Sequence, residues 1–134
     1  MITGGSRGLG AAITRAFHTA GDRVVIAART DTGLARELGD CARFIPTDVR
    51  HSEALRTAVA EAMTWTGRLD VLVNNAGLSA WRPLAEIDET FWDDMIATNL
   101  KGVLFASQAV AAVMQRGRRH SEHIESGREA GQCE

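Results

Sequence analysis

Glycines, a serine and an arginine are concentrated in residues 3–10, which read Thr-Gly-Gly-Ser-Arg-Gly-Leu-Gly. Glycines let the backbone turn sharply and approach a ligand closely, and the first N–H groups of a helix favour negative charge. An apolar stub precedes this loop, and a pattern of helical period follows it. The spacing of Gly4, Gly8 and Gly10 therefore predicts a cradle for a pyrophosphate, with a flexible glycine-rich terminus as the alternative.

A second group that could do chemistry follows the apolar run 24–28, which has the length and composition of a parallel strand buried on both faces. In dinucleotide-binding folds an acidic residue at the end of this strand contacts the ribose hydroxyls, whereas an arginine accommodates a 2′-phosphate. Arg29 follows the run directly, and Arg7 lies in the glycine loop. These cations favour NADP as the cofactor, and Asp31 keeps NAD as the alternative.

A third group is the run Asn74-Asn75-Ala76-Gly77, which follows a predicted strand over residues 69–73. In open α/β sheets the ligand lies just beyond the carboxyl ends of the strands. An asparagine amide can both donate and accept hydrogen bonds there, and small residues leave room for a ligand.

The elements that must position these groups alternate between helix and strand. Their order predicts an α/β fold: a doubly wound parallel sheet in three α/β/α layers. Besides the two strands above, we expect a helix over 9–19 ended by Gly21, a short helix over 32–38, an edge strand over 42–46, a helix capped by Ser52 and closed by Gly67, and two helices between Pro83 and Gly117, the first capped by Asp88.

The composition of the chain favours a globular protein and argues against nucleic-acid-binding and membrane proteins. The chain has 134 residues, 45% of them hydrophobic, and a net charge of −2, which predicts one globular domain without the basic surface that nucleic acids or anionic membranes require. With no run of eighteen apolar residues and no leader, we expect a soluble cytoplasmic protein that does not interact with membranes. His18 and His51 have no surrounding cluster of ligands, so no metal site is expected.

Five motifs occur in order: TGGSRGLG, AAR after the second strand, TDV, NNAG and TNLKG. This ordered set resembles the short-chain dehydrogenase/reductase family over residues 1 to about 117. The resemblance implies a Rossmann-like domain over 1–117 and an oxidoreductase that transfers hydride between a nicotinamide cofactor and a small carbonyl or alcohol substrate. It also implies a homodimer or homotetramer formed through the helices of residues 88–116.

The resemblance assigns roles to individual residues. Asn74 is expected to tie the sheet together, and Gly10 to pack helix against sheet. The implied cofactor contacts are Gly4, Ser6, Arg7, Gly8, Leu9 and Gly10 at the pyrophosphate, Asp48 and Val49 at the adenine, and Asn75, Ala76 and Gly77 at the ribose, in addition to Arg29.

The family's catalytic set is Asn, Ser, Tyr and Lys, of which only Asn99 is matched here. The chain contains no tyrosine, and Lys101 does not stand four positions after one. A tyrosine, whose ordinary pKa is about 10, does the acid–base work of the family when a cation lies nearby. We therefore expect this chain to be inactive. Whether it is an enzyme stays open, because the resemblance is to a family of enzymes but the catalytic Tyr and Lys are missing. A non-catalytic NADP-binding or dimerising fragment is the alternative, and a product that folds poorly is a third possibility.

The family pattern is broken at both ends. The first strand is reduced to residues 1–3, which suggests a missed or removed upstream start. Residues 118–134 read as a polar tail, either disordered or produced by a frameshift. When one nucleotide is skipped, the possible codons of residues 120–129 permit I-V-N-I-S-S-x-A-G-K/R, which resembles the family's strand carrying the catalytic serine. We hypothesise that the tail is frameshifted.

Overall fold

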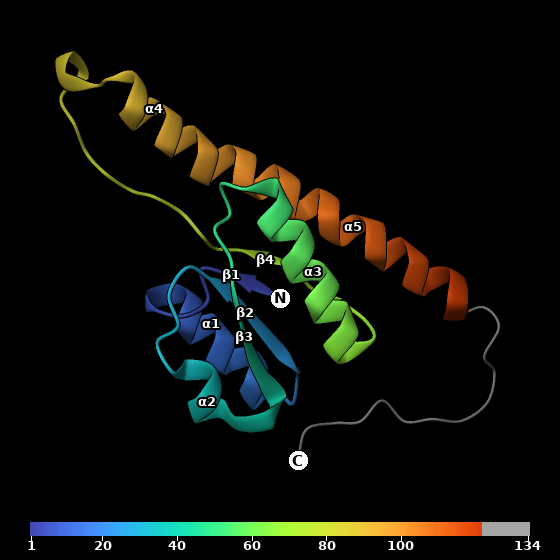
Figure 1. Cartoon of the computed structure of the whole chain (residues 1–134). Helices are drawn as coiled ribbons and strands as arrows, with labels where there is room; N and C mark the ends of the chain where they lie inside the picture. The colour runs from blue at the N-terminus through green and yellow to red at the C-terminus, as the bar shows by residue number, and fades with distance from the viewer. Residues whose placement is uncertain (122–134) are drawn as a thin grey trace.

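Four parallel strands form the centre of the molecule, in the order β3-β2-β1-β4. The computed structural model (Figure 1) describes residues 1–121, and side chains up to residue 114. The strands are β1 (Ile2–Thr3), β2 (Val24–Ala28), β3 (Ala42–Pro46) and β4 (Val73–Asn74). The bounds predicted for the second and third strands are confirmed, and β3 lies at an edge, as its proline requires.

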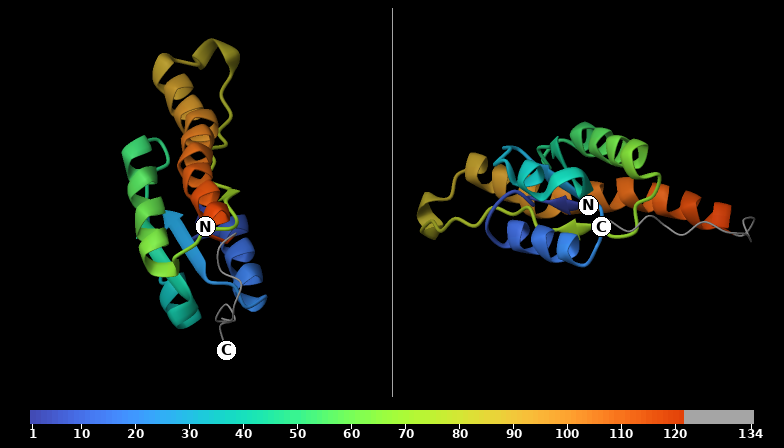
Figure 2. Two further views of the ribbon diagram at one scale, coloured as in Figure 1. Left: turned by 90° about the vertical axis from the view of Figure 1, so that its right-hand side faces the viewer. Right: turned by 90° about the horizontal axis from the view of Figure 1, so that it is seen from below.

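Strand β2 is buried over its whole length, as expected for a strand covered by helices on both faces. Figure 2 shows α1 (Gly8–Thr19) on one face of the sheet, with α3 (Ser52–Thr66) and α5 (Gly102–Ser121) on the other. Alternate residues of β2, Val25 and Ala27, join one core cluster with Ala58 of α3 and Val110 of α5. The predicted Rossmann-like α/β fold is confirmed.

The smaller elements complete the connections between the strands. They are α2 (Leu34–Leu38), the 3₁₀ turns η1 (Gly39–Cys41) and η2 (Leu84–Glu86), α4 (Glu89–Ile96), and a π-helical turn η3 (Ala97–Lys101). Gly67 closes α3 with a positive φ of 75°, as predicted. Asp88 caps α4 by accepting a 2.7 Å hydrogen bond from the Phe91 backbone N–H, also as predicted.

Three predictions about element ends are wrong. The short helix predicted over 32–38 begins at Leu34. Ser52 does not cap α3: His51 occupies the N-cap position and Ser52 is the first helical residue. Strand β4 is only two residues long rather than spanning 69–73, because its partner β1 begins at Ile2, which pairs with Val73. Before Val73 no β1 residue pairs with this segment, and the Met1 ammonium donates a 2.8 Å hydrogen bond to the Val71 carbonyl.

The two helices predicted between residues 83 and 117 form one continuous helical run, α4–η3–α5, whose α4 end extends away from the sheet (Figure 1). Several of its large apolar side chains are exposed: Trp92, Leu100 and Leu104 are each about 60% accessible. The run from Glu89 to Met114 is long and apolar enough to cross a membrane by length and composition, and 17% of its most apolar window is buried. Helix α5 continues past residue 117 to Ser121, and the predicted tail from residue 122 lies outside the described residues.

Candidate functional site

A cavity of about 520 Å³ opens at the carboxyl ends of the strands. It brings together four loops that are far apart in the sequence: the glycine loop and the loops after β2, β3 and β4. Of the predicted cofactor contacts, all but Gly8 line it; the full lining is Gly4, Ser6, Arg7, Leu9, Gly10, Ala27, Ala28, Arg29, Thr30, Thr47, Asp48, Val49, Arg50, Asn75, Ala76, Gly77, Leu78, Asp94 and Thr98.

The amino terminus of α1 is left free to meet an anion at this cavity. Its N-cap residue is Arg7, whose side chain makes no capping hydrogen bond, and its first turn has no acidic residue. The opening N–H groups of a helix have no intrahelical acceptors, and together with the helix dipole they favour a phosphate. This part of the site therefore suits the pyrophosphate that the sequence predicts.

Two glycines let the backbone pack closely around this loop. A Cβ on Gly10 would lie 2.2 Å from the Gly4 carbonyl oxygen, and a Cβ on Gly4 would lie 2.9 Å from Ala76 Cα. Gly10 thus packs α1 against the glycine loop itself and against the loop after β4. There is no space for a side chain at either position, because neighbouring protein atoms fill it.

Hydrogen bonds join the glycine loop to the loop after β4. The Asn75 Nδ2 group donates to the carbonyl oxygens of Thr3 and Gly4, both at 3.1 Å. Thr3 Oγ1 accepts from the backbone N–H groups of Asn75 and Ala76. The link across the sheet was expected from Asn74, whose amide instead donates to Ser107 Oγ of α5 at 3.1 Å.

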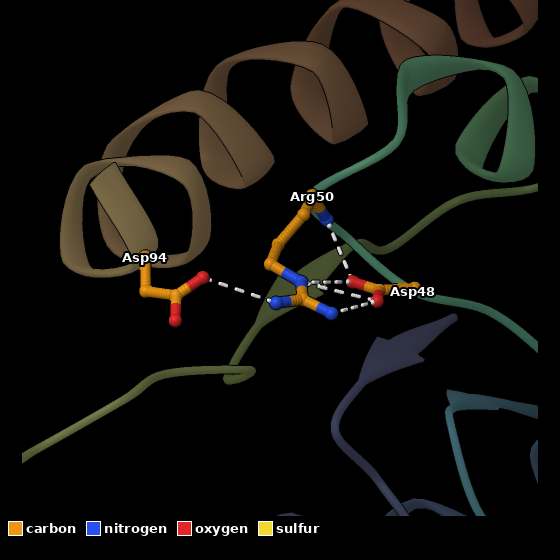
Figure 3. Close-up of polar contacts among 3 residues, drawn as sticks. All are labelled: Asp48, Arg50 and Asp94. Atoms are coloured by element: carbon orange, nitrogen blue, oxygen red, sulfur yellow. Dashed lines mark hydrogen bonds and ion pairs between the residues drawn. The ribbon is translucent and has the colours of Figure 1, made fainter. Parts of the chain in front are cut away.

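Three charged residues form one end of the cavity (Figure 3). Arg50 Nη2 lies 2.7 Å from Asp48 Oδ2, and Arg50 Nη1 lies 3.1 Å from Asp94 Oδ1 on α4. The hydrogen bonds from Arg50 hold the pKa of the Asp48 carboxyl below its ordinary value, against the opposing effect of desolvation. Asp48 is therefore an ionised acceptor at neutral pH, and the buried Val49 lies beside it.

The cations predicted to choose between cofactors lie at the rim of the cavity. Arg7 and Arg29 both line it and both are exposed. Asp31 does not line it, and its carboxylate accepts a 2.8 Å hydrogen bond from the Gly33 backbone N–H within its own turn. Thr32 Oγ1 donates to the Ser6 carbonyl at 2.8 Å and so holds this turn against the glycine loop.

Asn99 lies in the π-helical turn η3, outside the residues that line the cavity. Its side-chain amide binds the backbone of Leu78 in both directions: Oδ1 accepts from the N–H and Nδ2 donates to the C=O, each at 2.8 Å. In this arrangement the Asn99 side chain holds the loop after β4 in place.

Sequence reasoning missed several lining residues, among them Thr47, Arg50, Asp94 and Thr98. Arg50 carried a usable signal, since it stands two residues after Asp48 and ahead of a predicted helix. Asp94 carried none, because only the path of α4 brings it to the cavity. Within residues 1–121 no group of three or more His, Cys, Asp or Glu side chains could hold a metal ion.

Comparison with known proteins identifies the family. Residues 1–124 match the family described as short chain dehydrogenase. The chain is 40% identical over 123 residues to the Rhizobium meliloti protein named "Probable galactose dehydrogenase GalD", and 37% identical over 134 residues to sorbitol dehydrogenase of Cereibacter sphaeroides. These matches cover 87% and 98% of this chain but 48% and 52% of the relatives, so the chain spans about half their length.

Solved structures agree with this assignment. The glucose/ribitol-type short-chain dehydrogenase/reductase of Brucella melitensis superposes with a TM-score of 0.81 at 30% identity, covering 84% of this chain and 50% of that one. The 3-ketoacyl-(acyl-carrier-protein) reductase of the same organism, complexed with NADH, has a TM-score of 0.85 at 27% identity, covering 90% and 51%. The chain belongs to the short-chain dehydrogenase family of oxidoreductases, which bind a nicotinamide cofactor.

Proposed function

We propose that this chain is the cofactor-binding portion of an NADP(H)-dependent oxidoreductase, and that NADP(H) binds in the cavity at the carboxyl ends of the strands. The observation that carries the proposal is the uncapped amino terminus of α1, which meets the glycine loop beside two exposed arginines. A dinucleotide brings a pyrophosphate for the first feature and, in NADP, a 2′-phosphate for the second.

Each loop around the cavity has a place in this proposal. The glycine loop, with Gly4, Ser6, Arg7, Gly8, Leu9 and Gly10, holds the pyrophosphate. Asp48 and Val49 hold the adenine, and Asn75, Ala76 and Gly77 line the ribose. The tight packing at Gly4 and Gly10 supports the first of these, because it holds the amino terminus of α1 close against the glycine loop.

NADP is proposed over NAD because Arg29 and Arg7 are exposed at the cavity rim while Asp31 binds its own turn. NAD is the second candidate, since a structural neighbour is complexed with NADH. Isothermal titration of the full chain with NADPH and NADH tests the choice. Arg29→Gln should weaken NADPH binding by about tenfold or more, as a lost charged hydrogen bond does, with less than about a twofold effect on NADH.

The control for that titration is Arg36→Gln, which removes an exposed arginine from α2 outside the cavity lining. It should leave both affinities at the wild-type value. Equal weakening of NADPH and NADH by Arg29→Gln would contradict the proposed role of Arg29. Failure of the wild-type chain to bind either cofactor would contradict the proposed function itself.

When bound, the cofactor would supply or accept the hydride. The relatives are named as dehydrogenases of galactose and sorbitol, and a structural neighbour as a 3-ketoacyl-(acyl-carrier-protein) reductase. Within this chain, Asn99 holds the loop beside the proposed ribose site. The sequence contains no tyrosine to donate the alcohol proton, so we expect the 134-residue chain to bind cofactor without turnover. Measurable carbonyl reduction by the purified chain would contradict this; a non-catalytic NADP-binding or dimerising module is the alternative function.

The proposal also covers the localisation of the protein, its oligomeric state and residues 118–134. We place it in the cytoplasm, as a homodimer or homotetramer that pairs through the helical run of residues 88–116. Residues 118–134 are proposed to be a frameshifted tail that replaces the strand carrying the family's serine. Sequencing the gene across these codons tests this, because one inserted or deleted base must restore a serine strand and a downstream Tyr-x-x-x-Lys.

A further inference from the structure

Arg50 binds Asp48 through its backbone and its side chain at once. The Arg50 backbone N–H donates to Asp48 Oδ1 at 3.0 Å. Its Nε lies 3.1 Å from both carboxylate oxygens, and its Nη2 lies 2.7 Å from Oδ2. Such a fork fixes the plane of a carboxylate as well as its position, which a lysine ammonium does not do.

The other side of the guanidinium is held by a different element. Arg50 Nη1 donates to Asp94 Oδ1 at 3.1 Å, and Asp94 belongs to α4 (Figure 3). Asp48, Arg50 and Asp94 all line the cavity, with side-chain exposures of 23%, 35% and 50%. The hydrogen bonds from Arg50 to Asp94 and to Asp48 therefore link helix α4 to the loop after β3 along the cavity wall.

Resting on the cofactor site proposed above, the geometry points to Arg50 as a positioning residue that orients the Asp48 carboxylate toward the adenine amino group, with Asp94 holding Arg50 from behind. Three N–H groups of Arg50 donate to Asp48, with the Nε–H shared between the two oxygens. An ionised carboxylate has about four lone-pair sites, so about one is left to accept from a base. The 6-amino group of adenine is a donor, whereas the 6-oxo group of hypoxanthine is an acceptor. A correctly oriented Asp48 thus discriminates between the two bases.

The lowered pKa of Asp48 is consistent with this role, because an acceptor for an amino group must stay ionised. A purely structural tie between α4 and the loop after β3 would affect stability and all ligands alike. Base discrimination separates the two roles, since it depends on the orientation of one carboxylate.

The test compares NADP⁺ with its hypoxanthine counterpart, in which the 6-amino group is replaced by 6-oxo, by isothermal titration of the full chain. The wild type should prefer the adenine form. Arg50→Met should weaken NADP⁺ binding by about tenfold and the hypoxanthine form by less than about twofold, so the preference collapses. Arg50→Lys, which keeps the charge but lacks the forked guanidinium, should retain only part of the wild-type preference for the adenine form.

Asp94→Asn keeps the Arg50–Asp48 pair and should reduce the preference by a smaller factor in the same direction. Arg56→Met is the matched control: it removes an exposed arginine paired with Glu53 on α3, and should leave the preference unchanged. Circular dichroism and a thermal melt establish folding of each variant, and Arg50→Lys and Asp94→Asn carry the comparison if Arg50→Met does not fold.

Equal loss of both dinucleotides, or an unchanged ratio in folded Arg50 variants, would overturn the positioning role while leaving the cofactor site intact. Absence of binding to the wild type would instead overturn the proposed function.

Discussion

At the scale of single residues, the site depends on positions where side chains are excluded. Gly10 lies in the first turn of α1, and a Cβ there would lie 2.2 Å from the Gly4 carbonyl oxygen and 2.5 Å from Asn75 Nδ2. Neither neighbour can move freely: Asn75 also binds the Thr3 carbonyl, and the Gly4 backbone N–H donates to Ala27 at 2.7 Å. Substitution must therefore displace α1 from the glycine loop and from the loop after β4.

The prediction at this scale is that Gly10→Ala lowers the free energy of unfolding by about 1–3 kcal/mol, the usual cost of overpacking, despite the better helix propensity of alanine. It should also abolish cofactor binding, because the cradle opens. Urea denaturation and NADPH titration measure the two effects.

Ala12→Ser in the same helix is the control, since Ala12 is exposed and should change stability by no more than about 0.5 kcal/mol. A Gly10→Ala protein that unfolds at the wild-type urea concentration and binds NADPH normally would show that the close packing is not required.

At the scale of elements, β1 is shorter than its neighbour β2. It pairs with β2 and β4 over Ile2 and Thr3. The first two residues of β2, Val24 and Val25, have no β1 strand residue beside them. A second cavity of about 530 Å³ lies there, lined by Met1, Val25, Val71 and other residues of this end of the sheet. Burial of the Met1 ammonium lowers its pKa from 8.0 to about 6.

This burial predicts a pH dependence of stability. The unfolded chain takes up a proton at this amine below about pH 8 and the folded chain only below about pH 6, so the unfolded state binds more protons between these values. The free energy of unfolding should therefore rise by about 2–3 kcal/mol from pH 6 to pH 8 and level off above, as two pKa units imply.

Acetylation of the Met1 amine provides the control, because the acetylated chain retains every histidine but has no ammonium to desolvate. Its stability should lack this rise. Identical pH profiles of the two forms in urea denaturation would contradict the assignment to Met1.

At the scale of the whole molecule, the helical run α4–η3–α5 has one face on the protein and one face exposed. Ala106 and Val110 are buried, whereas Leu100 and Leu104 are 62% and 61% accessible. Strand β4 is also an edge of the sheet over the described residues. Exposed apolar surface and an open strand edge both favour association with other chains.

The chain is therefore expected to self-associate, and the double variant Leu100→Gln/Leu104→Gln should shift it toward the 14.4 kDa monomer in sedimentation velocity. Loss of two large apolar contacts should weaken association by about tenfold or more. The control pair Arg56→Gln/Glu61→Gln alters exposed residues of α3 and should sediment like the wild type. Unchanged association of the leucine variant would exclude this face as the interface.

Local patterns in the sequence determined the elements whose signals are short-range. The apolar run of β2, the proline that keeps β3 at an edge, Gly67 at the end of α3 and the Asp88 cap each act through neighbours a few residues away, and each is confirmed. The glycine spacing predicted a close approach of the backbone to a pyrophosphate, which stays a prediction. The structure shows that Gly10 packs against the Gly4 carbonyl.

Only the tertiary structure decided which distant groups meet. Residues 69–72 can form a strand only where another strand pairs with them. In the structure β1 pairs with β4 from Ile2 and Val73 onward, and among the earlier residues Met1 donates a hydrogen bond to the Val71 carbonyl. The side chain of Asn75, rather than that of Asn74, links β1 to the loop after β4. Asp94 reaches Arg50 only because α4 passes beside the cavity. Hydrogen bonds and ion pairs of this kind depend on the relative positions of whole elements, which packing sets and the spacing of residues along one chain does not contain.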